Sequence, residues 1–336
     1  MVKKINYFRN LQELRGMSAC LIVISHIPLV GITIGTSLGG YGVTMFFLLS
    51  GFLLIHSTEK STSFFLEKRI IRIIPMYYLI TLVTYVMASI QPEWFNTTVA
   101  TPQNLIKSLL FIPYMNPNGN VRPILDVAWA LFPEVWFYIV FYISLKISYK
   151  HRALITGGCF MTLFGIGMAV ENPILNQFKE AFLTLSIGMF LYYIWKWVPA
   201  VKINTKSWVP KFILVAMYFI IGILYNNLIY AKKRFLAIIL AYFVFCIFVV
   251  LEGKIRESNI LFKLGTISYS LYLTHEFIVK GVSRLVYSLD ELNVISFGVS
   301  VLCVFFAIGV AIALNKIIEK PVTVAMTKIL VNKKVK

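Results

Sequence analysis

Two ionisable side chains, Arg15 and His26, lie at or within the first long apolar stretch of this 336-residue chain. An ionisable group inside a membrane-spanning helix costs a few kcal/mol and usually marks a function. The two residues are eleven positions apart, so a helix places them on nearly the same face, about 16 Å apart along its axis. With Arg15 at the cytoplasmic boundary, His26 lies near mid-membrane, which suits an anion held at Arg15 and chemistry at His26. The alternative is that Arg15 reaches the lipid headgroups and His26 hydrogen-bonds to a neighbouring helix.

Glu134 is a third ionisable residue in an apolar context, V-A-W-A-L-F-P-E-V-W-F-Y. A helix that starts outside near Asp126 carries Glu134 about 12 Å deep, close to the expected depth of His26. A buried glutamate beside a buried histidine predicts an acid–base or orienting pair. A bridge between two helices without chemistry is the alternative.

Basic residues gather in E-K-R-I-I-R-I-I-P, where Lys68, Arg69 and Arg72 precede a long apolar run. Arg69 and Arg72 have i, i+3 spacing, which puts them on one helical face, and guanidinium groups suit phosphates. Ordinary anchoring at the cytoplasmic surface is the alternative. We expect Pro75 to lie where this helix begins its membrane run. Further along, G-T-I-S-Y-S-L-Y-L-T-H ends in His275, which we interpret as a polar contact between helices and keep as a second catalytic candidate.

The elements that must position these residues are membrane helices. Apolar residues make up 59% of the chain and charged residues 14%, against roughly a quarter charged in soluble domains. Only helices and closed barrels span lipid, and these runs are too long for barrel strands. We therefore predict an all-α polytopic bundle of about ten transmembrane helices, at 16–34, 38–57, 73–90, 126–145, 153–170, 181–198, 212–228, 235–251, 264–286 and 295–315.

The net charge of +18 follows the predicted topology. With the N-terminus inside, 23 of the 32 Lys and Arg residues fall in internal segments, as membrane topology favours. This distribution argues against a nucleic-acid partner and predicts a multi-pass protein of the plasma or inner membrane with both termini in the cytoplasm. The four cysteines lie in apolar runs without a C-x-x-C pair, so we expect neither disulfides nor a metal site.

The whole chain, residues 1–336, is predicted to be a single transmembrane domain without an appended soluble domain. Two polar stretches interrupt the pattern. Residues 91–125 are rich in turn-forming residues and predict an external loop or re-entrant cap. Residues 196–211 carry four lysines and two prolines and predict a cytoplasmic connector.

Six segments resemble, in order, the motifs of the acyltransferase family 3 membrane proteins, from residue 11 to residue 321. The segments are L-R-G-M-S-A-C-L-I-V-I-S-H, G-V-T-M-F-F-L-L-S-G-F-L-L, E-K-R-I-I-R-I-I-P-M-Y-Y, R-P-I-L-D-V-A-W-A-L-F-P-E-V-W-F-Y, L-G-T-I-S-Y-S-L-Y-L-T-H and I-I-E-K-P. The fourth is similar to the version found in exopolysaccharide acyltransferases. Each match is weak alone, and six in order are specific.

The resemblance implies acyl transfer from acyl-coenzyme A, usually acetyl-coenzyme A, to a hydroxyl of a cell-surface polysaccharide or lipid-linked sugar. By position, His26 would be the catalytic histidine, Arg15 its partner and Glu134 the motif glutamate. The coenzyme A end would be served by the basic residues Lys68, Arg69, Arg72 and Arg15. Trp129, in the tryptophan–glutamate motif, is a further candidate. Acyl-coenzyme A, a carbohydrate acceptor and the lipid bilayer are the implied partners, with other envelope-biosynthesis proteins possible.

The chain departs from the family pattern in two places. Many members have an aspartate two residues before the motif leucine, where this chain has Gln12, with Glu13 adjacent. We also expect no hydrolase-like secreted domain of the kind that some relatives carry, so the acyl group would reach its acceptor directly or through a partner. Two other functions remain as alternatives. A transporter or flippase of a glycan or lipid-linked sugar should show repeats and broken helices, and a structural envelope subunit would not require Arg15, His26 and Glu134 at coordinated positions.

Overall fold

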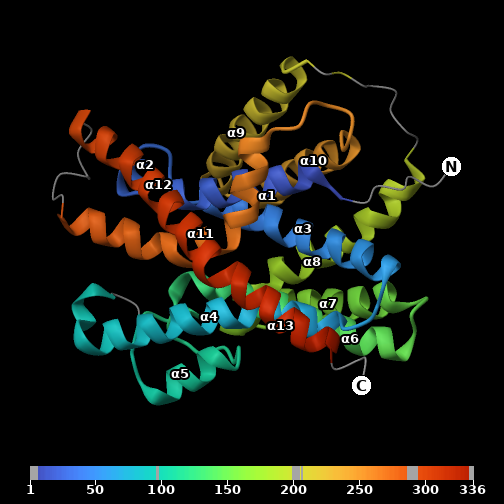
Figure 1. Ribbon diagram of the computed structural model, residues 1–336, viewed down its shortest axis with the longest axis horizontal. Helices are drawn as coiled ribbons and strands as arrows, with labels where there is room; N and C mark the ends of the chain where they lie inside the picture. Colours follow the sequence, from blue (N-terminus) through green and yellow to red (C-terminus); the bar gives the residue numbers. More distant parts are fainter. Residues whose placement is uncertain (1–6, 96–97, 199–204, 206, 286–293, 333–336) are drawn as a thin grey trace. The chain divides into compact units, whose positions relative to one another are not determined.

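The computed structural model describes residues 7–95, 98–198, 205, 207–285 and 294–332. Within these ranges the chain is helical, and the one isolated β-bridge pairs Met115 with Val121. The predicted all-α class is therefore confirmed (Figure 1).

Among the described residues, thirteen α-helices follow in chain order, with short 3-10 segments at Pro92–Trp94 and Asp126–Ala130 and a π-helical turn at Asn315–Glu319. They are α1 (Arg9–Ser25), α2 (Pro28–Thr33), α3 (Leu38–Lys60), α4 (Phe65–Ile90), α5 (Pro102–Leu109), α6 (Leu131–Ile147), α7 (Arg152–Ala169), α8 (Pro173–Trp197), α9 (Val209–Tyr230), α10 (Arg234–Val250), α11 (Asn259–Leu285), α12 (Val294–Leu314) and α13 (Lys320–Asn332).

The helices form two compact units, and each is described by itself. The first unit comprises Met1–Phe52 and Phe190–Ile312, and the second comprises Leu53–Met189 and Ala313–Lys336. The chain passes from one unit to the other within α3 and α8 and near the end of α12. The prediction of a single transmembrane domain stays a prediction.

In the part of the chain that the structure describes, six helices are long and apolar enough to cross a membrane: Leu38–Lys60, Phe65–Ile90, Asp126–Ile147, Arg152–Ala169, Val209–Tyr230 and Val294–Leu330. Each contains or overlaps a predicted stretch. The other four predicted stretches fall on α10, which has 17 residues, on α8 and α11, which are not among these six helices, and on the broken α1–α2 segment. The structure supports a membrane helical bundle, and the count of ten spans stays a prediction.

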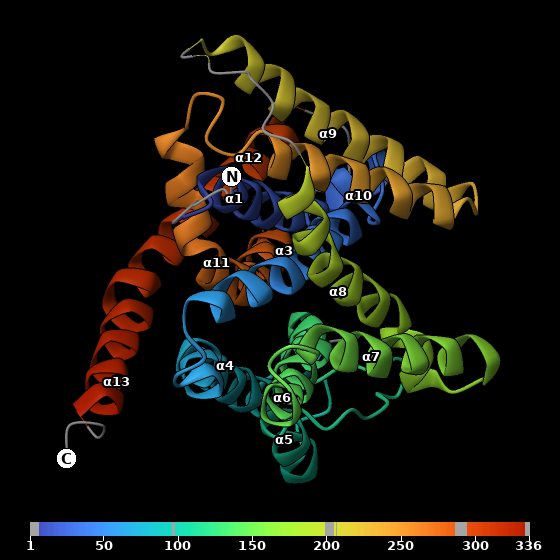
Figure 2. The ribbon, with the colours of Figure 1, turned by 90° about the vertical axis from the view of Figure 1, so that its right-hand side faces the viewer.

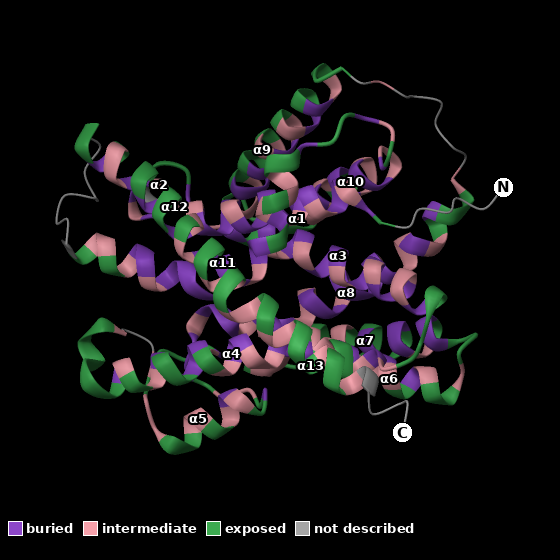
Figure 3. Ribbon diagram, in the orientation of Figure 1, coloured by how far each residue is buried: buried purple, intermediate pink, exposed green. Residues whose placement is uncertain are grey.

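The outer surfaces of several of these helices are apolar. In the Val209–Tyr230 window 28% of residues are buried, and in the Val294–Leu330 window 22%. Phe212, Ile220, Leu302 and Phe305 are among the large exposed side chains there, and Figure 3 shows α9 and α12 with much exposed surface. Exposed apolar surface of this kind suits contact with lipid chains rather than water.

The predicted first span, 16–34, is not one helix. α1 begins at Arg9 and ends at Ser25, with His26 as its C-cap, and α2 begins at Pro28. Ile27 is extended, with ψ of 126°. A residue before proline disfavours the helical region, and proline has no N–H to continue the ladder. His26 therefore sits at a helix break, and Arg15 sits inside a helix rather than at its boundary.

The helix that contains the predicted third span, 73–90, begins earlier than that span. α4 starts at Phe65, so Pro75 lies within the helix and Lys68, Arg69 and Arg72 lie on its first turns. Hydropathy marks where charged residues stop, whereas the helix starts after Phe64, whose φ of 53° is left-handed. The helix that contains the predicted span 295–315 is also longer than that span, because it continues through a π-helical turn to Asn332.

The two polar stretches have different outcomes. Residues 91–125 contain a 3-10 turn and the short helix α5, consistent with a loop that folds on itself. Thr101 caps α5 by accepting a hydrogen bond from the Asn104 amide. In the predicted connector 196–211, residues 199–204 and 206 lie outside the described residues.

Candidate active site

In the first unit α1 packs against α11 through glycine (Figure 2). A Cβ added to Gly16 would lie 2.6 Å from the backbone nitrogen of Gly265, and one added to Gly265 would lie 2.0 Å from the carbonyl oxygen of Gln12. These contacts are with backbone, which cannot move aside as a flexible side chain can. Glycine is therefore required for the two helices to approach this closely.

This crossing brings two histidines together. His26 lies ten residues after Gly16, and His275 lies ten residues after Gly265, so both are about 15 Å beyond the crossing along their helices. The two rings make an edge-to-face contact with centroids 4.8 Å apart and planes at 76°. His275 is fully buried, whereas His26 is exposed.

Each histidine has one ring nitrogen fixed by its own helix. His26 Nδ1 lies 2.8 Å from the carbonyl oxygen of Ile22, and His275 Nδ1 lies 2.7 Å from that of Tyr272. A carbonyl oxygen only accepts hydrogen bonds, so we assign the proton of each neutral ring to Nδ1. The Nε2 atoms then carry lone pairs, and among the described residues His275 Nε2 has no hydrogen-bond partner.

Arg15 lies on α1, two turns after the helix begins, and is partly buried. The carboxylate beside it, Glu13, is buried and belongs to an ion pair: Lys211 Nζ lies 2.6 Å from its Oε2, and the Ser258 amide donates to its Oε1 at 2.6 Å. Glu13 therefore holds α1 against α9 and the start of α11. Glu13, next to the position where many family members have an aspartate, thus makes structural contacts in this chain.

The N-terminus of α1 is capped by a side chain from the turn that follows α10. The Glu252 carboxylate, just after α10, accepts hydrogen bonds from the backbone amides of Arg9 at 2.7 Å and Asn10 at 3.0 Å. A carboxylate at a helix N-terminus satisfies its free N–H groups and its positive dipole end. Burial nevertheless raises the pKa of Glu252 to about 7, against these hydrogen bonds, which lower it.

The second unit contains a different polar cluster, here called the arginine cluster: Arg69, Tyr138, Glu134 and Ser57. The Tyr138 hydroxyl donates to Glu134 Oε1 at 2.5 Å, and Arg69 donates to Ser57 Oγ at 3.0 Å. The Arg69 guanidinium lies 5.2 Å from the centroid of the Tyr138 ring. The structure thus joins the motif arginine and the motif glutamate through a tyrosine.

The remaining predicted residues are placed as follows. Glu134 lies in the first turn of α6, after five residues of 3-10 helix, and belongs to the second unit. His26 belongs to the first unit, so their predicted pairing stays a prediction. Trp129 is partly buried, and its ring lies 5.0 Å from the Arg122 guanidinium carbon. Within the described part of the chain, no cluster of three or more His, Cys, Asp or Glu residues could hold a metal ion.

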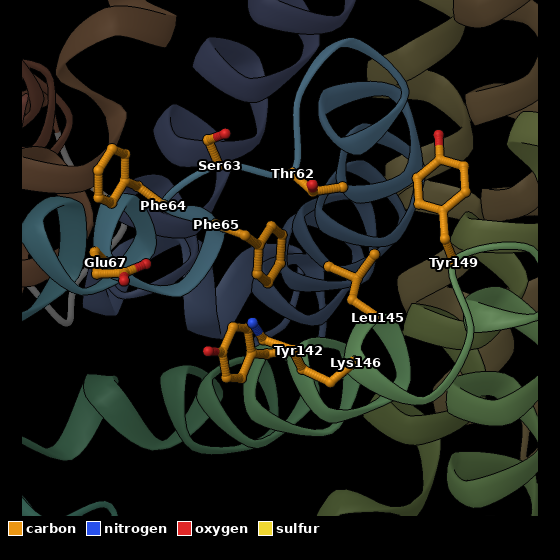
Figure 4. Close-up of a pocket in the computed structure, with 9 residues that line it drawn as sticks. All are labelled: Thr62, Ser63, Phe64, Phe65, Glu67, Tyr142, Leu145, Lys146 and Tyr149. Carbon is orange, nitrogen blue, oxygen red and sulfur yellow. The ribbon is translucent and has the colours of Figure 1, made fainter. Parts of the chain in front are cut away.

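Lys68 and Arg72 differ from Arg69 because both are exposed. Next to them along the chain is a pocket of about 340 Å³ between the α3–α4 turn and the end of α6 (Figure 4). Its walls combine aromatic rings, hydroxyls and one cation. They are Thr62, Ser63, Phe64, Phe65, Glu67, Tyr142, Leu145, Lys146 and Tyr149.

Two features of the site were missed by sequence reasoning. The contact between His26 and His275 depends on two helices far apart in sequence, but a signal exists: each histidine follows a glycine by ten residues. Tyr138 was also missed, although it follows Glu134 by four residues, the spacing that brings side chains together on a helix.

Comparison with known proteins places the chain in a family. The model of the acyltransferase domain (Acyl_transf_3) matches residues 9–315. The chain is 28% identical over 257 residues to the exopolysaccharide production protein ExoZ of Rhizobium meliloti (strain 1021), covering 74% of this chain and 79% of ExoZ. It is 24% identical over 286 residues to the protein named "Putative acetyltransferase ORF330" of Acidianus two-tailed virus, covering 80% and 83%. No solved structure matches the chain significantly. Because the family match spans nearly the whole chain, this protein belongs to acyltransferase family 3.

Proposed function

We propose that this membrane acyltransferase moves an acetyl group from acetyl-coenzyme A to a hydroxyl of a cell-surface polysaccharide or lipid-linked sugar. The observation that carries the proposal is His26, an exposed histidine at a helix break whose Nδ1 is tied to Ile22. This leaves a lone pair on Nε2, as a general base or an acyl carrier requires. Non-helical backbone at membrane depth is tolerated where it lines a cavity, which suits a substrate-facing position.

The donor's phosphates need cations at the cytoplasmic end of the protein. Lys68 and Arg72 are exposed on the first turns of α4, a helix of 26 residues and so about 39 Å long. This exceeds the roughly 30 Å hydrocarbon layer, so its charged first turns can extend beyond the lipid. We propose that the phosphates bind to Lys68 and Arg72, with Arg69 beside them on the same helix. A role in donor binding for Arg15, which belongs to the first unit, stays a prediction.

The neighbouring pocket suits the nucleotide end of the donor. Phe65, Tyr142 and Tyr149 offer flat apolar surfaces to a purine, and Lys146 offers a cation. Glu67 disfavours a phosphate at its own position, so the phosphates belong on the Lys68 and Arg72 side. With both termini in the cytoplasm, as the distribution of Lys and Arg favours, this end faces the cytoplasmic pool of acyl-coenzyme A in the inner membrane.

The experiment uses purified protein in lipid nanodiscs with acetyl-coenzyme A labelled in its acetyl group. Candidate acceptors are oligosaccharides of exopolysaccharide type, and the labelled ester and released thiol are measured together. Equal amounts of ester and thiol support the proposal. Movement of the glycan across vesicles without use of the donor would instead support a transporter and overturn it.

A further inference from the structure

Tyr149 lies in the turn between α6 and α7 and lines the pocket of about 340 Å³ in the second unit (Figure 4). Two other rings of the wall are less available to a ligand. Phe65 is buried against Phe141, with ring centroids 5.2 Å apart, and the half-buried Tyr142 ring has the Lys146 ammonium 5.4 Å from its centroid. Tyr149 is 49% exposed, so it is the ring that a flat ligand in this pocket can cover most fully.

Arg152, the first residue of α7, holds Tyr149 in two ways. Its guanidinium carbon lies 4.0 Å from the centroid of the Tyr149 ring, and its Nη1 donates a hydrogen bond to the Tyr149 backbone carbonyl oxygen at 2.6 Å. The Tyr149 hydroxyl also donates to the carbonyl oxygen of Thr58 on α3, at 3.4 Å. A tyrosine in a turn would otherwise sample several rotamers, so these contacts fix the orientation of its ring.

Within the described part of the chain, Arg152 is buried without a counter-ion. It is 4% exposed, forms no ion pair with a carboxylate there, and has no hydrogen-bond partner for its Nε. A buried cation without a counter-ion is costly, because burial removes the water that solvates it. A methionine would fill a similar volume without that cost. The charge and the planar shape of Arg152 therefore indicate a role beyond packing, and the group that they contact is Tyr149.

We propose that the adenine ring of coenzyme A stacks on Tyr149, and that Arg152 is the positioning residue that holds the tyrosine ring for it. This inference rests on the function proposed above, in which the pocket takes the nucleotide end of the donor. Every nucleobase has a flat face that stacks on an aromatic side chain. A ring that is already fixed loses less freedom on binding, so more of the contact energy appears as affinity. The pocket thereby selects donors that carry a purine.

The experiment compares two donors with purified protein in lipid nanodiscs: acetyl-coenzyme A, and S-acetyl-phosphopantetheine, which keeps the thioester arm but lacks adenosine. Tyr149→Ala should raise the KM for acetyl-coenzyme A about tenfold, within the range of base–aromatic stacking, with kcat unchanged. Arg152→Met, which loses the cation and the hydrogen bond, should raise this KM about threefold or more. Neither variant should change kcat/KM for S-acetyl-phosphopantetheine. Tyr149→Phe keeps the ring and should bind acetyl-coenzyme A nearly as the wild type does.

Lys150→Met is the matched control, because it removes an exposed cation from the same turn. It should leave kcat/KM unchanged for both donors. A misfolded fraction lowers kcat/KM for both donors alike, so the ratio of the two values separates a loss of folded protein from a loss of adenine binding.

If Tyr149→Ala or Arg152→Met lowers the two kcat/KM values in proportion, or leaves both unchanged, the inference is wrong. Equal kcat/KM of the wild type for the two donors would also overturn the adenine site, while leaving acyl transfer in place. A wild-type protein that transfers acetyl from neither donor would overturn the proposed function itself, which separates the two failures.

Discussion

The arginine cluster of the second unit and the His26–His275 pair of the first unit accommodate ionisable groups in a membrane bundle in opposite ways. In the second unit, Arg69, Tyr138 and Glu134 are bound to one another or to Ser57, so opposite charges share one network. In the first unit, the Nδ1 atoms of His26 and His275 hydrogen-bond to backbone carbonyl oxygens of their own helices, whereas the Nε2 atoms make no such bond. A network whose groups satisfy each other holds helices in place, whereas a pair with basic lone pairs can move a proton.

The first way to break the histidine pair is to separate its helices. Gly265→Ala would place a methyl group 2.0 Å from the Gln12 carbonyl oxygen, so α1 and α11 must move apart. Overpacking of this kind costs about 1–3 kcal/mol, and a displacement of about 1 Å at a reacting group can cost about 100-fold in rate. We expect turnover to fall by that order, with a lower melting temperature.

Gly281→Ala is the matched control, since it lies on the same helix and a Cβ there meets nothing within 4 Å. It should keep wild-type turnover. Normal activity in Gly265→Ala would show that the close crossing does not position the histidines.

A second prediction concerns the exposed cations beside the arginine cluster. The Lys68→Ala, Arg72→Ala double variant should raise the KM for acetyl-coenzyme A about tenfold or more while kcat changes little, because two charge-assisted contacts to phosphate are lost. Its donor affinity should also depend less on salt than that of the wild type. Steady-state kinetics at two ionic strengths measure both effects.

The control for charge alone is the Lys232→Ala, Lys233→Ala double variant, which removes two exposed cations from the turn before α10. It should leave the KM unchanged. An equal rise of KM in both double variants would assign the effect to overall charge and not to a donor site.

A third prediction tests whether the arginine cluster is mainly structural. Tyr138→Phe removes the hydroxyl that donates to Glu134 and leaves a partly buried carboxylate oxygen without that bond, at a cost of about 1 kcal/mol, the lower end of the range for buried groups. We expect a lower free energy of unfolding in detergent with turnover reduced only a few-fold. Tyr85→Phe on α4 is the comparison for loss of a tyrosine hydroxyl. A loss of turnover as large as that of Gly265→Ala would place the arginine cluster in the chemistry.

A fourth prediction, on stability rather than turnover, is a pH dependence at the α1 cap. Burial raises the pKa of Glu252 to about 7, above its ordinary value of 4.5. Between these values the folded protein binds a proton that the unfolded chain does not, so stability is greatest at low pH and falls as pH rises towards 7. The wild type should lose at most about 3 kcal/mol over this window.

Glu252→Gln should flatten this profile, because a neutral amide can still accept hydrogen bonds from the α1 amides. Thermal melts at pH 5 and pH 8 measure the difference, with Glu171→Gln, an exposed carboxylate, as the control. A wild-type melting temperature that rises with pH would contradict the assignment.

Local sequence predicted much of the fold and part of the site. Long apolar helices at the stretches 38–57, 126–145, 153–170 and 212–228 are confirmed, because long apolar runs depend only on neighbouring residues. Pro28 indicates a helix break after His26, but the continuous apolar run favoured a single span over 16–34. The contact of His26 with His275 could not be derived from hydropathy, since it requires two distant helices to cross at Gly16 and Gly265 in one register.

The most direct test of the account is the turnover of His26→Ala together with its affinity for acetyl-coenzyme A. Loss of a general base costs about 10²- to 10⁴-fold in rate, whereas loss of a structural hydrogen bond in a membrane bundle costs about 0.6 kcal/mol, less than tenfold. We predict that His26→Ala inserts, binds the donor with wild-type affinity and loses at least about 100-fold in acyl transfer. Turnover above about a tenth of the wild-type value would contradict a chemical role for His26.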